Sequence, residues 1–146
     1  MINTHEKALE VYNKTQNYLE ENEDFREEIE NLIWVYHDLG DLIPQTVEKF
    51  WSGHYFPYKE SYFELENSYL LTTYGFYRYA FISLRVVLEL GLLSVYWDKN
   101  DEAHRDIQKW LKSMENTPFR DKLCKGLINI KNVKISGDLI SFGKYL

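Results

Sequence analysis

The segment that decides the fold of this chain is YKESYFELENSYLLTTYGFYRYAFISLRVVLELGLLSVYW, residues 58–97. It holds 40 residues without a proline, is rich in Leu and Glu, and shows no alternation of polar and apolar residues. These features predict an α-helix through most of the segment. Thr72, Thr73 and Gly75 form the expected break, so the segment makes either one kinked helix or two consecutive helices.

Charged residues argue against a membrane span in this segment. Residues 79–97 are strongly apolar, but Arg85 and Glu89 lie in their middle. A span needs about 20 predominantly apolar residues, and each central charge costs on the order of 2.5–3.5 kcal/mol. We therefore expect a buried helix of a soluble protein and no membrane partner.

Apolar residues recur at intervals of three and four on both sides of the central segment, which predicts further amphipathic helices. These helices are expected at about 4–20, 25–40, 44–51, 107–114 and 118–130. The last residues, from 133 on, predict a short hairpin or irregular tail. We expect an all-α antiparallel bundle of about five or six helices, packed as one domain over 1–146 around the 58–97 helix. The apolar end of the chain is typical of a piece of a longer protein.

The composition suits a soluble globular domain with unusually many aromatic residues. A chain of 146 residues buries roughly 68–70% of its unfolded surface, and this one contains 8 Phe, 4 Trp and 12 Tyr. Such side chains suit a small core, a thin helical layer, an interface or an aromatic-lined groove. The single Cys124 excludes an intramolecular disulfide, and the N-terminus carries no secretory signal. We expect a cytoplasmic protein.

Familiar catalytic and cofactor motifs are absent from the sequence. No phosphate-binding glycine loop, nucleophile elbow or cysteine nucleophile signature occurs, and the four histidines are isolated from one another. We therefore expect no catalytic residue, no metal, no cofactor and no sequence-specific DNA binding.

The best candidate site is a charged strip on the central helix. Arg78, Arg85 and Glu89 project onto one side of a helix whose other sides are apolar between 76 and 97. One interpretation is a solvent edge or an internal ion pair that fixes helix packing. The other is a groove in which the two guanidinium groups bind phosphate or carboxylate and Glu89 orients them. Nearby rings for stacking a base would come from Tyr74, Tyr77 and Tyr96.

A second basic region follows the central segment. Residues 1–50 carry a net charge of −8 and residues 101–146 carry +3. The bases concentrate in 109–134, where Lys109, Lys112, Lys122 and Lys125 stand out. This region is either a solvated lysine-rich surface or a contact for RNA phosphates, with salt-dependent affinity.

Residues 74–97, YGFYRYAFISLRVVLELGLLSVYW, resemble bacterial helical proteins of the HEPN-like kind. The resemblance rests on Gly75, Tyr77, Ala80, Leu84-Arg85 and Leu88-Glu89. It implies an antiparallel helical bundle, frequently a dimer, in toxin–antitoxin or phage-defence settings, sometimes with metal-independent RNase activity. The nuclease members carry Arg-x4-His, and no arginine here has histidine at that spacing. The resemblance therefore supports the fold more than an activity.

We predict a non-catalytic helical interaction or oligomerisation module of a bacterial protein, which self-associates through aromatic surface or binds a protein partner. An RNA-binding or RNase-related protein that uses Arg78, Arg85 and the 109–134 segment is the alternative. A third hypothesis is an aromatic pocket for a small ligand.

Overall fold

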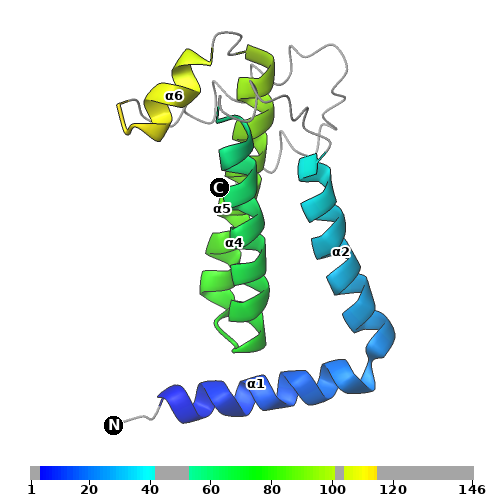
Figure 1. The fold of residues 1–146 in the computed structure, drawn as a ribbon. Coiled ribbons are helices and arrows are strands. Elements are labelled where there is room, and N and C mark those ends of the chain that lie inside the picture. The colour runs from blue at the N-terminus through cyan, green and yellow to red at the C-terminus, as the bar shows by residue number, and fades with distance from the viewer. Residues whose placement is uncertain (1–3, 42–52, 101–103, 115–146) are drawn as a thin grey trace, which may run out of the picture.

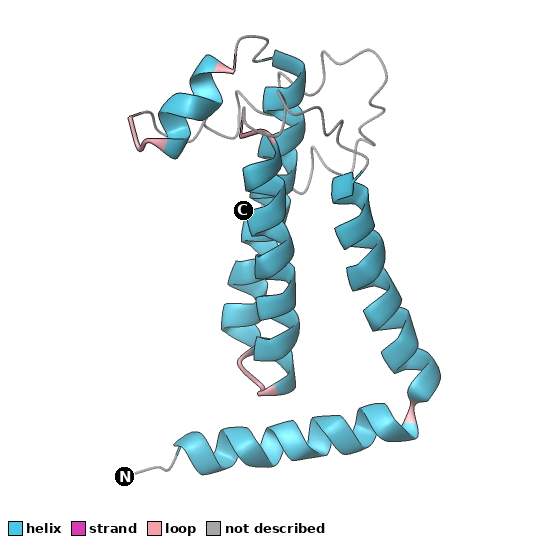
Figure 2. Ribbon diagram, viewed as in Figure 1, coloured by secondary structure: helices cyan, strands magenta, loops and turns pink. Residues whose placement is uncertain are grey.

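The computed structural model describes residues 4–41, 53–100 and 104–114, and these residues form helices and short connections only (Figure 1; Figure 2). The all-α prediction is confirmed. The predicted helices at 44–51 and 118–130 and the predicted hairpin tail lie outside the described residues. The helices are α1 (Thr4–Glu21), α2 (Glu23–Asp41), α4 (Tyr55–Thr73), α5 (Tyr77–Asn100) and α6 (Arg105–Leu111).

The central segment is two helices, because the predicted break reverses the chain. Gly75 adopts a left-handed φ of 79°, a conformation that glycine reaches without the steric cost of a Cβ. The amide of Gly75 donates to the carbonyl of Thr72 at 3.0 Å, and the amide of Phe76 donates to that of Leu71 at 2.8 Å. These are the two hydrogen bonds that define a Schellman motif at the C-terminus of a helix. They end α4, so that α5 runs back beside it as an antiparallel hairpin.

Small residues line the contact between α4 and α5, which is the most extensive helix pair among the described residues. The small-residue seam consists of Ser61 and Ser68 on α4 and Ala80, Ser83 and Ser94 on α5, all buried. Ser68 Oγ donates to the carbonyl of Ala80 at 3.1 Å, and Ser94 Oγ donates to the carbonyl of His54 at 3.0 Å. Because the seam has few side-chain atoms and satisfied hydroxyls, the two backbones pack closely.

A tyrosine lock holds α2 against this hairpin. The ring of Tyr36 stacks on that of Tyr58 with 5.0 Å between centroids. The hydroxyl of Tyr36 lies 2.7 Å from Ser61 Oγ, and the hydroxyl of Tyr58 donates back to the carbonyl of Tyr36. A Cβ at Gly91 of α5 would lie 3.1 Å from the Tyr36 hydroxyl. The lock therefore joins α2, α4 and α5 at one level of the bundle.

Helix α1 lies across the end of the hairpin where α4 turns into α5 (Figure 1). Its Tyr12 stacks on Tyr74 with 4.6 Å between centroids. Its Val11 lies so close to the turn that a Cβ at Gly75 would be 2.9 Å from Val11 Cγ1. This helix therefore closes one end of the hairpin.

Helix α6 covers the opposite end of α5. Leu93, Trp97 and Ile107 are almost fully buried there, and Trp97 meets Trp110 with 5.1 Å between ring centroids. The imidazoles of His54 and His104 contact each other through Nε2 and Nδ1. The main described core therefore lies at the α6 end of the hairpin.

Candidate functional site

The predicted charged strip lies on solvent. Buried Ala80, Ser83 and Ser94 define the side of α5 that faces α4, and Arg78, Arg85 and Glu89 project from the opposite side. Arg85 Nε lies 2.8 Å from Glu89 Oε1, and their side chains are 53% and 56% exposed. The strip is neither in the core nor in a cleft. An exposed pair of this spacing contributes roughly 0.2–0.5 kcal/mol to the helix.

The three tyrosines predicted beside the strip have three different surroundings. Tyr77 is 57% exposed and Tyr96 is buried at the α6 end of the hairpin. Tyr74 stacks on Tyr12 of α1. Of these three tyrosines, only Tyr77 presents an open ring near Arg78, and the structure does not assemble the three rings into one stacking surface.

The described part of the basic segment is distant from Arg78 along the hairpin. Lys109 and Lys112 are exposed at α6, which lies at the end of α5 opposite the turn that precedes Arg78 (Figure 1). Lys109 Nζ lies 3.7 Å from Asp106 Oδ1. Lys122 and Lys125 lie outside the described residues. The described residues therefore do not join these two sets of bases into one surface.

The most prominent feature of α5 is an exposed apolar stripe beside the charges. The α5 stripe consists of Tyr77, Phe81, Leu84, Leu88 and Val95, all of them exposed. Their spacing of four, three, four and seven residues keeps them on one side of the helix. Phe81 is 71% exposed. Sequence periodicity did not reveal the stripe, because α5 is apolar on nearly all sides.

Helix α5 is also long and apolar enough to cross a membrane, with 39% of its most apolar 18 residues buried in the protein. The core helix of a soluble protein passes the same test. The centre of its exposed side carries Arg85 and Glu89, and the prediction of no membrane partner stays a prediction.

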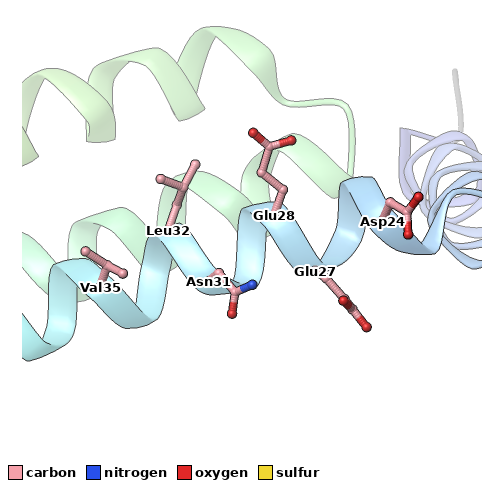
Figure 3. A pocket seen from close by; sticks show the side chains of 6 residues that line it. All are labelled: Asp24, Glu27, Glu28, Asn31, Leu32 and Val35. Carbon is pink, nitrogen blue, oxygen red and sulfur yellow. The ribbon is translucent and has the colours of Figure 1, made fainter.

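A second partly apolar surface lies on the outer side of α2. A shallow depression of about 380 Å³ is lined by α2 alone, and Figure 3 shows Glu28 and Leu32 projecting at one edge of the drawn helix and Glu27 and Asn31 at the other. Leu32 and Val35 are highly exposed. The carboxylates of Asp24, Glu27 and Glu28 have no ion-pair partner among the described residues. The complete lining is Asp24, Glu27, Glu28, Asn31, Leu32 and Val35.

A groove of about 340 Å³ runs between α2 and α4 and reaches Ser68 of the small-residue seam. Its walls are almost wholly apolar. The lining residues are Ile29, Leu32, Ile33, Tyr36, Leu65, Ser68 and Tyr69. Leu32 belongs both to this groove and to the outer depression, so the two apolar surfaces of α2 are continuous.

Burial controls the electrostatics of the tyrosine lock. It raises the pKa of the Tyr36 hydroxyl, against a smaller opposing effect of the hydrogen bond to Ser61. It also raises the pKa of Tyr58, and the neighbouring Tyr36 and Tyr55 add to that rise. Both hydroxyls therefore stay protonated at neutral pH and serve as hydrogen-bonding groups.

Groups of three or more metal-ligating side chains do not occur within residues 4–41, 53–100 and 104–114. His54 and His104 contact each other, but two histidines are fewer than the three or four protein ligands that are typical of zinc. From the sequence, all four histidines were predicted to be isolated from one another. No motif could have revealed this pair, because 50 residues separate its members.

Comparison with protein-family models, with curated proteins and with solved structures finds no match to this chain. The fold and the candidate surfaces define a class only, an all-α helical protein with an exposed apolar helix side beside a charged strip. The HEPN-like resemblance stays a prediction.

Proposed function

We propose that this chain is a non-catalytic helical interaction module and that the α5 stripe is its binding surface. The observation that carries the proposal is the exposure of Tyr77, Phe81, Leu84, Leu88 and Val95 beside Arg85 and Glu89. The largest apolar patch of a typical monomer covers about 300–600 Å² and is often functional. At the side-chain areas usual for aromatics, Tyr77 and Phe81 alone expose roughly 200–300 Å². The aliphatic members of the stripe extend this area.

Substitution of Phe81 tests the proposal. We expect Phe81→Asp to abolish the association that light scattering detects. The helical circular dichroism signal should stay unchanged, because the Phe81 side chain is mostly exposed to solvent and packs little against the rest of the chain. Phe63→Asp is the matched control. Phe63 is also an exposed phenylalanine, but it lies on α4 and contacts Lys59 through a cation–π interaction.

Three outcomes decide the proposal. Loss of association with Phe81→Asp alone supports it. Equal loss with both variants means that association is a general property of exposed apolar residues, and it removes the assignment to α5. A wild-type chain that stays monomeric and captures no protein at high micromolar concentration contradicts the proposed function itself.

RNA binding is the second candidate, and one observation favours it. Arg78 is exposed without an ion-pair partner among the described residues, and the exposed ring of Tyr77 is its neighbour. Arg85, in contrast, is engaged by Glu89. If this candidate holds, fluorescence anisotropy should detect single-stranded RNA at low salt, with affinity that falls steeply with salt and falls further in Arg78→Ala. No binding at low salt would eliminate it.

A further inference from the structure

The described helices leave one corner of a four-helix arrangement open. Helix α4 packs against both α5 and α2, whereas α2 and α5 have few contacts with each other. In a four-helix bundle a fourth helix occupies the remaining corner. No helix within the described residues occupies the corner between α2 and α5 (Figure 1). The open corner is the strongest unexplained feature of the molecule.

Two apolar stripes border the open corner. Gly91 lies three residues after Leu88 on the side of the α5 stripe, and it faces the hydroxyl of Tyr36 on α2. The α5 stripe is therefore on the α2 side of the hairpin. On α2, exposed Leu32 and Leu39 lie about a quarter turn from the side that packs against α4. Leu32 also lines the groove that reaches the seam.

The tyrosine lock fixes which residues of α2 and α5 lie at the same height. The two helices run in the same direction, and Tyr36 is level with Gly91. Because both helices rise about 1.5 Å per residue, Arg78 and Arg85 lie level with about residues 23 and 30 of α2. The first two turns of α2 carry Asp24, Glu27 and Glu28 at these heights. The bases of α5 and the acids of α2 therefore occupy the same slice of the bundle.

From this geometry we propose that the open corner is filled by α5 of a second copy of this chain, related by a two-fold axis parallel to the helices. The proposal rests on the proposed function, because it names the partner of the same α5 surface. Each α5 then packs in parallel against its counterpart through Phe81, Leu84 and Leu88. The axis must be parallel to the helices, because a two-fold axis perpendicular to them would place the partner's α4 in the space that α2 occupies.

The same operation brings opposite charges together. It places the outer side of each α5 against α2 of the partner. Because the rotation axis is parallel to the helices, every residue keeps its height along the bundle. Arg78 and Arg85 therefore face the partner's α2 at the turns that carry Asp24 and Glu28. Such pairing is self-complementary, since each copy supplies one basic and one acidic surface. A lipid surface offers no partner for Arg85 and Glu89 at its apolar centre. A second copy satisfies both the apolar and the charged parts of α5.

The area of the surface fits a dimer of ordinary size. A stable interface buries about 800 Å² on each partner. The aromatic side chains of the α5 stripe supply roughly 200–300 Å² of this, and the remaining stripe residues together with Leu32, Val35 and Leu39 of α2 supply more. Two parallel α5 helices with apolar residues at intervals of three and four have the packing of a short coiled coil.

A charge-swap experiment tests the arrangement. The acidic variant carries Arg78→Glu and Arg85→Glu, and the basic variant carries Asp24→Lys and Glu28→Lys. In a dimer of either variant with itself, like charges meet at both contacts between α5 and the partner's α2. We therefore expect this dimer to be at least about tenfold weaker than the wild-type dimer. Mixed together, each variant supplies the charge that the other lacks. We expect native mass spectrometry to show a heterodimer and wild-type affinity to return to within about threefold.

The matched control for the acidic variant makes the same change in net charge elsewhere. Lys7→Glu with Lys14→Glu, both exposed on α1, should leave the dimer unchanged. Circular dichroism must show that all variants keep the helical content of the wild type. This is expected, because Arg85→Glu replaces the ion pair with Glu89 by a like-charge pair, which weakens the helix by only a few tenths of a kcal/mol.

The outcomes separate this inference from the proposed function. If Phe81→Asp abolishes the dimer but both charge variants keep it, or if the folded variants do not pair when mixed, the arrangement is wrong and the binding surface stands. If the wild type is monomeric, captures no protein, and Phe81→Asp changes nothing, both fail. A monomeric wild type that binds phosphatidylcholine vesicles, or that captures a different protein through Phe81, overturns the second copy as the occupant.

Discussion

Replacement of Gly75 by alanine should destabilise the protein, because the added methyl group meets both an unfavourable backbone conformation and a close neighbour. Gly75 has a φ of 79°, a region that costs a residue with a Cβ about 1–2 kcal/mol. The added Cβ would lie 2.9 Å from Val11 Cγ1, so α1 or the turn must shift. Overpacking of this kind costs about 1–3 kcal/mol. We expect a loss of about 2–5 kcal/mol of unfolding free energy in total.

A double-mutant cycle with Val11→Ala separates the two contributions. In that background the added methyl meets no Val11 Cγ1, so the cost of Gly75→Ala should fall by about 1 kcal/mol or more while the backbone cost stays. Gly75→Asn should cost less than Gly75→Ala in backbone strain, because asparagine adopts the left-handed conformation more readily. Urea unfolding followed by circular dichroism measures each free energy from the midpoint and slope.

Gly91→Ala is the matched control. Its backbone is helical, where alanine is favoured over glycine by about 0.5–1 kcal/mol, and its added Cβ would meet only the terminal Tyr36 hydroxyl, at 3.1 Å. We expect a change near zero. The reasoning fails if Gly75→Ala lies within about 0.5 kcal/mol of the wild type, the range of neutral surface substitutions. An equal cost in both backgrounds would show that α1 does not pack on the turn.

Two further predictions concern the tyrosine lock. Tyr36→Phe removes the 2.7 Å hydrogen bond to Ser61 but keeps the stacked ring, so the unfolding free energy should fall by about 0.5–1.5 kcal/mol; no change in a thermal melt would show that α2 is not held there. Stability should also fall at alkaline pH, because burial raises the folded-state pKa of Tyr36 and Tyr58 above the unfolded value of about 10. Their contribution is complete below about pH 10 and is lost as pH rises toward the folded pKa. Urea midpoints across this range measure the loss, which should shrink in Tyr58→Phe.

Within the described residues, the sequence predicted the helices and the position of the break but not the reversal. Helical periodicity located α1 and α2 within a few residues, because one side of each is apolar and the other polar. Thr72, Thr73 and Gly75 indicated a weak point in the helix, but a kink and a turn begin with the same residues. The hydrogen bonds that Gly75 and Phe76 donate to α4 decide for a turn. They depend on the backbone conformation and leave no separate pattern in the sequence.

The small-residue seam was missed because its members are mostly polar. Because serine is polar, the hydropathy of the sequence predicts that Ser61, Ser68 and Ser94 lie on the surface. Each is instead buried, with its hydroxyl hydrogen-bonded to a backbone carbonyl. The available signal was their spacing. Ser61 and Ser68 are seven residues apart, and Ala80 and Ser94 on α5 are fourteen apart, intervals that place residues on one side of a helix. In a helix that is apolar nearly all round, the small residues mark the packed side better than the large ones do.

The position of the small residues also explains why the charged strip is outside. If Arg85 and Glu89 faced α4, two long side chains would separate helices that the seam brings together, and their desolvation would cost several kcal/mol for each charge. On the outer side the pair contributes only a few tenths of a kcal/mol to the helix, so it adds little to the fold. It does restrict what can cover the α5 stripe. An uncharged apolar surface would desolvate the Arg85–Glu89 pair and Arg78 without offering either a charged partner, whereas an acidic and apolar helix such as α2 would meet Arg78 and Arg85 with carboxylates and Phe81 with leucine. In the proposed dimer the strip therefore acts on the choice of partner, and charge reversal at Arg85 should change which chain binds more than it changes how stably this one folds.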